Sequence, residues 1–253
     1  MLQGLNFIKY ITGFLFLLLV SCTKEESITP DAGDYTPQTS KGYIINHTYY
    51  TLSYSNSDRQ SEFAYYYLSP QSINGGQSRT DDFRIDPKVK SNPVSSTGYQ
   101  GSGYDRGHLC PAADMALNKT SMSETFYMSN MSPMTPAFNR GIWSTVESWV
   151  RESALSNGGL YVVTGPILNG NCGVLSGGIV VPCSFYKIAF KGGSNPKIIG
   201  FVLSNSGSSS PVRSFAVSVD EIERRTGIDF FPQLEDGVEN QIEGVVNYGG
   251  WNL

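Results

Sequence analysis

The chain has 253 residues, and its 22 acidic side chains exceed its 18 basic ones, giving a net charge of −4 at pH 7. This length suits one domain with a substantial core, and the acidic balance argues against a protein that coats nucleic acid through a generally basic surface. The sequence has only two histidines and contains no H-E-x-x-H or C-x-x-C pair, no P-loop and no G-x-S-x-G turn. Zinc sites, nucleotide sites and serine-hydrolase sites of the usual kinds therefore find no support.

The amino-terminal segment has the pattern of an export signal. Lys9 precedes an apolar run over residues 11–20 that is short for a membrane-spanning helix. The run ends in the tetrapeptide LVSC at residues 19–22, which looks like the lipobox of bacterial lipoproteins. This resemblance implies a signal peptide over residues 1–21, cleavage before Cys22 and lipidation of its sulfur; the alternative is an ordinary signal peptide with an incidental cysteine.

Residues 22–42 are expected to hold the lipidated cysteine and a flexible tether. They are rich in Thr, Ser, Asp, Pro and Gly without apolar periodicity, which is typical of a solvated linker. The charged triplet Lys24-Glu25-Glu26 resembles the short signal that directs some Gram-negative lipoproteins to the outer face of the outer membrane. The expected location is therefore the cell envelope, as an outer-membrane lipoprotein, with exposure at the cell surface as one arrangement.

Residues 43–253 show no repeats and no change of composition, and they predict one α+β domain. An apolar periodicity from Arg140 to about Ser156 predicts an amphipathic helix, and Ser- and Gly-rich stretches predict loops at 92–103 and 204–210. Short runs rich in Tyr, Val and Ile predict strands. The expected strands lie at residues 47–54, 62–68, 160–164, 179–190 and 197–203.

The first chemically informative motif is Asp105-Arg106-Gly107-His108. An imidazole with an ordinary pKa of about 6.5 can accept a proton from water near neutral pH. Arg106 can hold a phosphate oxygen through its planar guanidinium, and Gly107 would let backbone and ligand approach closely. The motif favours a phosphodiester hydrolase, although an ordinary hydrogen-bonded histidine on a strand would give the same four letters.

A second group of motifs lies further along the chain. It comprises SNMSP at residues 129–133, FNRGIW at residues 138–143, and Glu147. Together with the Asp-Arg-Gly-His run, in this order and at this spacing, these motifs resemble the DNA/RNA non-specific endonucleases of the ββα-metal superfamily, which include secreted bacterial and mitochondrial nucleases. The similarity covers roughly residues 43 to 245.

The resemblance implies a central antiparallel sheet flanked by helices, with a ββα-metal element at the active site. It also implies an enzyme that cuts DNA and RNA endonucleolytically, leaving 5′-phosphate and 3′-hydroxyl ends, with Mg²⁺, or alternatively Mn²⁺ or Ca²⁺, as cofactor. Carried over by position, it makes His108 the general base that activates water. Asn139 would be the one protein ligand of the cation, and Glu147 would orient water molecules around it.

The resemblance also implies groups that contact the phosphate. Arg106 would stabilise its charge, and Asn130 matches a position close to metal and phosphate. A further arginine upstream is expected to contact the phosphate, with Arg79 favoured over Arg84. The basic residues in the segments that build this site predict a local cationic groove on an acidic protein, and hence weak, salt-sensitive binding. They are Arg79, Arg84, Lys88, Lys90, Arg106, Arg140 and Arg151.

Chemistry alone leaves other interpretations of these residues open. Glu147 and Arg151 could form an exposed i,i+4 ion pair, and Asn139 could cap the following helix. His47 matches no catalytic position and is expected to be structural.

The remaining cysteines also have alternative interpretations. Cys172 and Cys183 could form a disulfide across a Gly-rich segment in an exported protein. Cys110 would then be a small buried thiol rather than a nucleophile.

Two other functions compete with the nuclease. One is a catalytically silent surface module that binds nucleic acid or another polyanion, and the other is a metal-dependent phosphodiesterase that acts on small or lipid diesters. The first would keep its affinity in EDTA, and the second would leave plasmid DNA intact.

Overall fold

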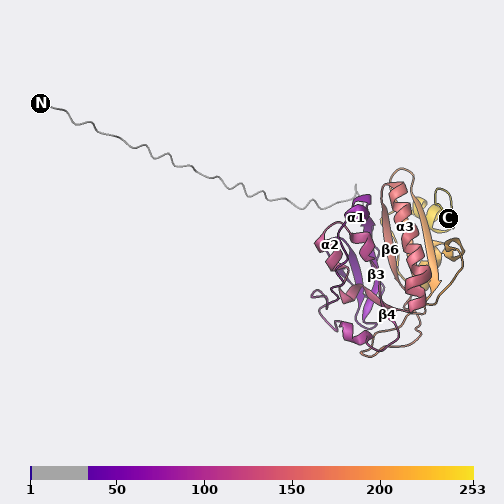
Figure 1. Ribbon diagram of the computed structural model, residues 1–253. Helices are drawn as coiled ribbons and strands as arrows, with labels where there is room; N and C mark the ends of the chain where they lie inside the picture. Colours follow the sequence, from indigo (N-terminus) through magenta and orange to yellow (C-terminus); the bar gives the residue numbers. More distant parts are fainter. Residues whose placement is uncertain (2–33) are drawn as a thin grey trace. The chain divides into compact units, whose positions relative to one another are not determined.

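The computed structural model describes Met1 and residues 34–253 (Figure 1). The expected signal peptide, Cys22 and most of the expected tether lie outside the described residues. Within the described part of the chain, no helix is long and apolar enough to cross a membrane.

The chain joins the domain before residue 43, which the sequence suggested as its start. The ring of Tyr35 packs edge-on against Tyr161 and Phe190, with centroids 4.9 and 5.1 Å apart. Gln38 donates its backbone N–H to the carbonyl of Asp229 at 3.0 Å. The end of the expected tether therefore packs as part of the domain, because a tyrosine within it fills an apolar position.

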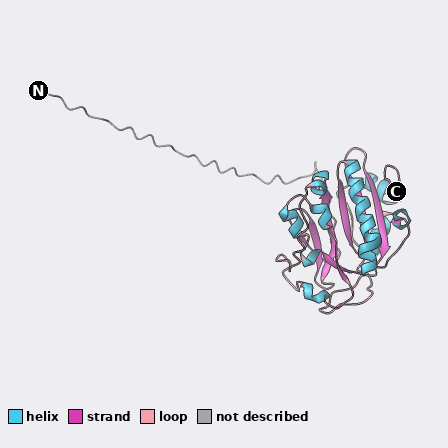
Figure 2. Ribbon diagram, viewed as in Figure 1, coloured by secondary structure: helices cyan, strands magenta, loops and turns pink. Residues whose placement is uncertain are grey.

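The main element is a seven-stranded sheet in which all neighbouring strands are antiparallel (Figure 2). The order is β1-β2-β3-β6-β7-β8-β9. Side chains alternate between its faces, so that in β3 Ala64 and Tyr66 belong to one core cluster and Phe63 to another. The strands are β1 (Tyr43–Asn46), β2 (Thr51–Ser55), β3 (Gln60–Leu68), β6 (Leu160–Pro166), β7 (Ser184–Lys191), β8 (Lys197–Ser204) and β9 (Ala216–Val217).

Helices cover both faces of this sheet. On one face, α3 (Ser144–Asn157) lies over the sheet (Figure 1). Its residues Val146 and Val150 are buried in the first core cluster. On the other, α4 (Val219–Thr226) buries Ile222 in the second cluster, to which α5 (Asp236–Glu243) adds Ile242. This arrangement confirms the predicted α+β class with an antiparallel sheet flanked by helices. The shorter helices are α1 (Pro70–Asn74), α2 (Lys119–Glu124), η1 (Ser96–Tyr99), η2 (Ala112–Met115), η3 (Met128–Asn130) and η5 (Val212–Phe215).

The strand predicted at residues 47–54 is in fact a turn followed by β2. His47 donates its backbone N–H to the carbonyl of Tyr50 at 2.8 Å, which closes the turn between β1 and β2. The His47 ring stacks on Tyr127, and its Nε2 lies 3.1 Å from buried Asp86. The aromatic letters that suggested a strand therefore pack around a tight turn, and His47 has the structural setting expected of it.

The other predicted strands correspond to β3, β6, β7 and β8, although β7 begins only at Ser184. The predicted helix begins at Ser144 rather than Arg140, because a π-helical turn, η4 (Phe138–Trp143), precedes it. The turn is broken at Gly141, whose backbone angles (φ −107°, ψ −115°) are not helical.

Cys172 and Cys183 form a disulfide that closes the loop before β7. Within this loop Val174 and Val180 form an isolated antiparallel bridge. Cys110 is free and fully buried, and burial raises the pKa of its thiol well above its usual value. A buried neutral thiol is not a nucleophile, in line with the interpretation of Cys110 as a packing residue.

Candidate active site

A second, two-stranded sheet carries the Asp-Arg-Gly-His run. Its strands β4 (Asp105–His108) and β5 (Met131–Met134) are antiparallel, with His108 opposite Met131. Because η4 and α3 follow β5 directly, the two strands and this helix form a strand-strand-helix unit. Alternation along β4 places Arg106 and His108 on the same side of the strand.

Gly107 is constrained by packing within this unit, a reason for glycine that the motif alone did not indicate. It is buried, and a Cβ atom built on it would lie 2.2 Å from Sδ and 2.4 Å from Cγ of Met134. The strands can pack closely here only because Gly107 has no side chain.

His108 lies between two aromatic rings. Its ring centroid is 5.0 Å from that of Phe126 and 5.8 Å from that of Phe83. Nε2 is buried and has no hydrogen-bond partner among the described residues. Burial, followed by the positive charges of Arg79 and Arg106, lowers the pKa of His108 to about 3. The imidazole is therefore neutral at pH 7, with a nitrogen left without a partner.

Two guanidinium groups lie next to the same aromatic rings. Arg106 stacks over Phe83 at 3.8 Å, and Arg79 over Phe126 at 4.7 Å. Both line a cavity of about 540 Å³. The other residues lining it are Asp81, Phe83, Ser96, Tyr99, Gln100, Tyr104, Asp105, Asn139 and Arg140.

Arg84 and Lys88, two other basic residues expected in the groove, are engaged elsewhere. Arg84 stacks on Tyr127 and pairs with Asp82 at 2.7 Å, and it is not part of the cavity. Lys88 donates to the carbonyl of Asn46. Arg79 therefore lines the cavity next to the ring that packs against His108, although it also pairs with Asp81 at 2.7 Å, whereas Arg84 lies outside the cavity.

Asn139 reaches the cavity from η4 and is held by Asp105. Its amide nitrogen donates to the Asp105 carboxylate at 3.0 Å, and Arg140 donates to the same carboxylate at 2.9 and 2.7 Å. Burial opposes ionisation of Asp105, but these hydrogen bonds outweigh it and lower its pKa. No described residue donates to the Asn139 amide oxygen, which leaves that oxygen available to a cation.

The role of Asp105 escaped the sequence analysis, although it opens the Asp-Arg-Gly-His motif. Its carboxylate bonds to residues more than thirty positions away in the sequence, which no local pattern indicates. Asn139 does not cap α3. It lies inside η4, and the N-cap residue of α3 is Trp143, which makes no side-chain capping hydrogen bond.

Glu147 lies in the first turn of α3 and is half-buried. Burial raises its pKa to about 7, even though the positive charge of Lys187 acts to lower it. The alternative i,i+4 pair with Arg151 is not formed, because Arg151 donates to Asp114 at 2.9 Å. No described residue forms a hydrogen bond with the Glu147 carboxylate.

Lys187 is a second residue that the sequence analysis missed. It is only 1% exposed, its Nζ lies 4.6 Å from the Trp143 ring, and burial lowers its pKa. Nζ has no hydrogen-bond partner among the described residues. A lysine on a buried strand position was the available signal, since such a charge is rarely kept without a purpose.

Asn130 is fully buried and does not line the cavity. Its amide nitrogen donates to the carbonyls of Cys110 and Thr125 at 2.9 and 2.8 Å, and its amide oxygen accepts the Cys110 N–H at 2.9 Å. The side-chain amide of Asn130 is bonded to backbone groups, among them those of Cys110, two residues beyond His108. Asn130 therefore positions the end of β4 just beyond His108. Its closeness to metal and phosphate, which the resemblance implies, stays a prediction.

Asn139, which lines the cavity, and Glu147, which does not, offer oxygen donors of the kind that suits a hard divalent cation. An amide oxygen at Asn139 and a carboxylate at Glu147 both lack hydrogen bonds from described residues. Mg²⁺ needs few protein oxygens because it retains several of its waters.

The fold and the site together define a phosphodiester hydrolase. The profile of the DNA/RNA non-specific endonuclease family matches residues 32–237, and the chain belongs to this family. Its members typically use a divalent metal ion.

Related proteins agree with this assignment. A nuclease from Nostoc sp. is 32% identical over 265 residues, covering 92% of this chain and 96% of its own. Human mitochondrial endonuclease G is 30% identical over 202 residues, covering 73% of this chain and 68% of its own. A crystal structure of EndoG in complex with EndoGI superimposes with a TM-score of 0.71 at 28% identity, covering 77% of this chain and 87% of that one. The chain is therefore a non-specific nuclease that hydrolyses nucleic acids.

Proposed function

We propose that the chain cuts DNA and RNA endonucleolytically with Mg²⁺ as its cation and His108 as the general base. The observation that carries this proposal is the environment of His108. Its imidazole is neutral, its Nε2 has no described partner, and two arginines of one cavity lie beside it. A base in this state can take a proton from water without first losing one.

The arginines supply the complementary charge. Arg79 and Arg106 would hold the non-bridging phosphate oxygens and stabilise the negative charge that grows as water attacks phosphorus. Binding through phosphate rather than through base edges or 2′-hydroxyls accounts for cutting both DNA and RNA. His108 would accept the proton of the attacking water at Nδ1, because Nε2 is buried away from solvent.

Asn139 and Glu147 would serve the cation. Asn139 would bind it through the amide oxygen that Asp105 leaves free, and Glu147 would orient water nearby. When bound, the cation would neutralise charge on the phosphate and ease departure of the 3′-oxygen. Mn²⁺ or Ca²⁺ are the alternatives to Mg²⁺ at this position.

This proposal is tested by digestion of supercoiled plasmid and of RNA in Mg²⁺, Mn²⁺, Ca²⁺ or EDTA. Wild-type protein should degrade both substrates with Mg²⁺ and neither in EDTA. Asn139→Ala should lose both activities, whereas Asn169→Ala, at an exposed asparagine, should retain them. Hydrolysis of a small chromogenic diester with intact plasmid would instead indicate the phosphodiesterase. Binding that persists in EDTA without cleavage would indicate the silent module.

We also propose that the chain is an outer-membrane lipoprotein anchored at Cys22. The LVSC tetrapeptide after a short apolar run and the charged residues that follow it support this location. Expression of the full chain in a Gram-negative host with radiolabelled palmitate should label the wild type but not Cys22→Ala. Label-free wild-type protein released into the periplasm would contradict the anchor.

A further inference from the structure

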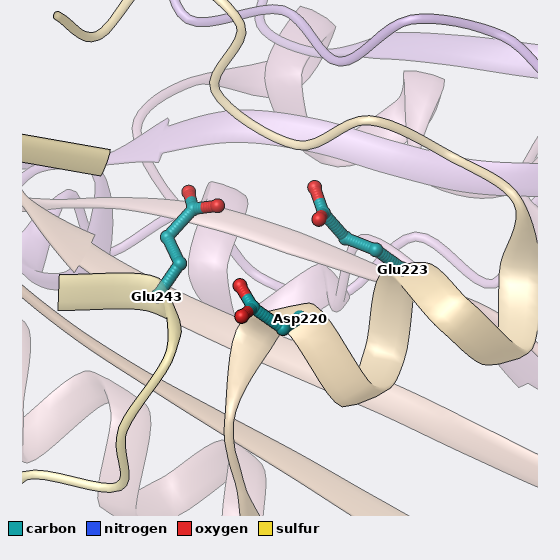
Figure 3. A group of neighbouring side chains, drawn as sticks. All are labelled: Asp220, Glu223 and Glu243. Atoms are coloured by element: carbon teal, nitrogen blue, oxygen red, sulfur yellow. The ribbon is translucent and has the colours of Figure 1, made fainter. Parts of the chain in front are cut away.

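A group of three carboxylates lies away from the nuclease site, where α4 meets the end of α5. Asp220 and Glu223 project from α4, and Glu243 is the last residue of α5. One oxygen of each lies within 4.8 Å of the others. Figure 3 shows the three side chains turned toward a common space between the two helices. α4 and α5 pack in the core cluster on the sheet face opposite α3, so this group is separate from Asn139 and Glu147.

Glu243 is the residue that sets this group apart from an ordinary acidic surface. It is 1% exposed, and its Oε1 is buried without a hydrogen-bond partner among the described residues. A buried carboxylate oxygen without a donor is costly unless a cation or a hydrogen bond compensates it.

The surroundings of Glu243 supply no such compensation. The charges that act most strongly on it belong to Glu223, Glu239, Asp220 and Asp229, all of them acidic. The nearest arginines of α4, Arg224 and Arg225, pair with Glu221 instead. Glu243 also lies at the carboxyl end of α5, where the helix dipole disfavours negative charge and the last turn has no basic residue.

We propose that Asp220, Glu223 and Glu243 bind a Ca²⁺ ion that joins α5 to α4. Ca²⁺ takes carboxylate oxygens at about 2.3–2.6 Å, so that two oxygens on one ion can lie up to about 5 Å apart. The observed separations, all within 4.8 Å, satisfy this limit. Mg²⁺, with bonds of about 2.0–2.1 Å, would require the carboxylates to lie closer together and to displace its tightly held waters.

Glu223 and Asp220 could bind the ion without losing their present contacts. Glu223 accepts the backbone N–H of Phe230 at 2.8 Å and so is already oriented by the loop after α4. Asp220 is exposed in the first turn of α4 and can turn toward an ion without loss of packing. The ion would replace the repulsion among these acids by attraction and fix the end of α5 on the domain.

The test must exclude cation binding at the nuclease site, so it uses the full chain carrying Asn139→Ala as the reference protein. After treatment with EDTA and dialysis, addition of Ca²⁺ to about 10 mM should raise the Tm of this protein by about 4 °C or more, as expected for a weak carboxylate site in a domain of this size. Calorimetric titration should give one Ca²⁺ per chain.

The variant Asn139→Ala/Glu243→Gln should fold, because glutamine has nearly the shape of the carboxylic acid, and burial raises the pKa of Glu243 to about 9, so that the ion-free side chain is mainly uncharged near neutral pH. Its Tm should not respond to Ca²⁺. The matched control Asn139→Ala/Glu152→Gln, which removes an exposed acid of α3, should keep the full response. Glu243→Gln alone should retain Mg²⁺-dependent cleavage within about twofold, because distant sites act independently. An equal Ca²⁺ response with and without Glu243, or no response in the reference protein, would overturn the proposal.

Discussion

Two titratable side chains at the site are shifted in opposite directions by the same cause. Burial disfavours the charged form of each, so it lowers the pKa of His108 to about 3 and raises that of Glu147 to about 7. Near neutral pH the histidine is therefore in its neutral form. The ionisation of Glu147, in contrast, changes within the working range.

The pH dependence of cleavage should consequently follow Glu147 rather than His108. If the carboxylate form is the active one, activity is present above pH 7 and lost as the pH falls through about 7. Glu147→Gln should lower kcat/KM by about 10- to 100-fold and remove this acidic limb from the profile. A limb near pH 7 that persists in Glu147→Gln would assign it to another group.

Lys187 should act as a positioning residue through its charge. Its ammonium group lowers the pKa of Glu147, so Lys187→Met should raise that pKa and move the acidic limb of kcat/KM to higher pH. Lys187→Arg should restore the position of the limb if it folds, because it keeps the positive charge. A purely structural role would lower stability in Lys187→Met while leaving the midpoint of the pH profile in place.

At the level of elements, the strand pair β4–β5 holds the catalytic motif through close packing. Gly107→Ala should destabilise the protein by about 1–3 kcal/mol, because the new methyl group would overlap Met134. Urea unfolding measures this effect, and the double variant Gly107→Ala/Met134→Ala should recover part of the loss. Additive losses in the double variant would show that the two side chains do not compete for space.

The main elements were predictable where a pattern lies within one segment. The apolar runs of β3 and β8 and the periodicity of α3 gave their types and nearly their bounds. The turn at His47 could not be predicted, because His47 packs against Tyr127 and Asp86, which lie elsewhere in the chain. The late start of α3 depends on the break at Gly141, for which no distinct signal was visible.

The residues of the candidate site also fall into those that the sequence could indicate and those that it could not. His108, Arg106 and Asn139 could be proposed as site residues because the motifs that contain them resemble those of a known family. Asp105 and Lys187 could not, because their partners lie on other elements and only the folded chain brings them together.

For the molecule as a whole, the contrast between net charge and local charge governs substrate binding. The chain is acidic overall, yet Arg79, Arg106 and Arg140 line one cavity. If they neutralise two or three phosphates, log kcat/KM for duplex DNA should fall against log salt with a slope of about −2 to −3. Arg79→Ala should make this slope shallower, as measured by initial rates over a salt series; an unchanged slope would place Arg79 outside the substrate contact.

The most direct test of the account is the rate of plasmid cleavage by His108→Ala, measured under single-turnover conditions in Mg²⁺ beside the wild type and His47→Ala. Loss of the general base should slow cleavage by about 10²- to 10⁴-fold while plasmid binding is retained. His47→Ala, which removes the buried partner of Asp86, should affect stability more than the rate of the folded protein. Cleavage by His108→Ala at the wild-type rate would contradict the assignment of His108 as the base.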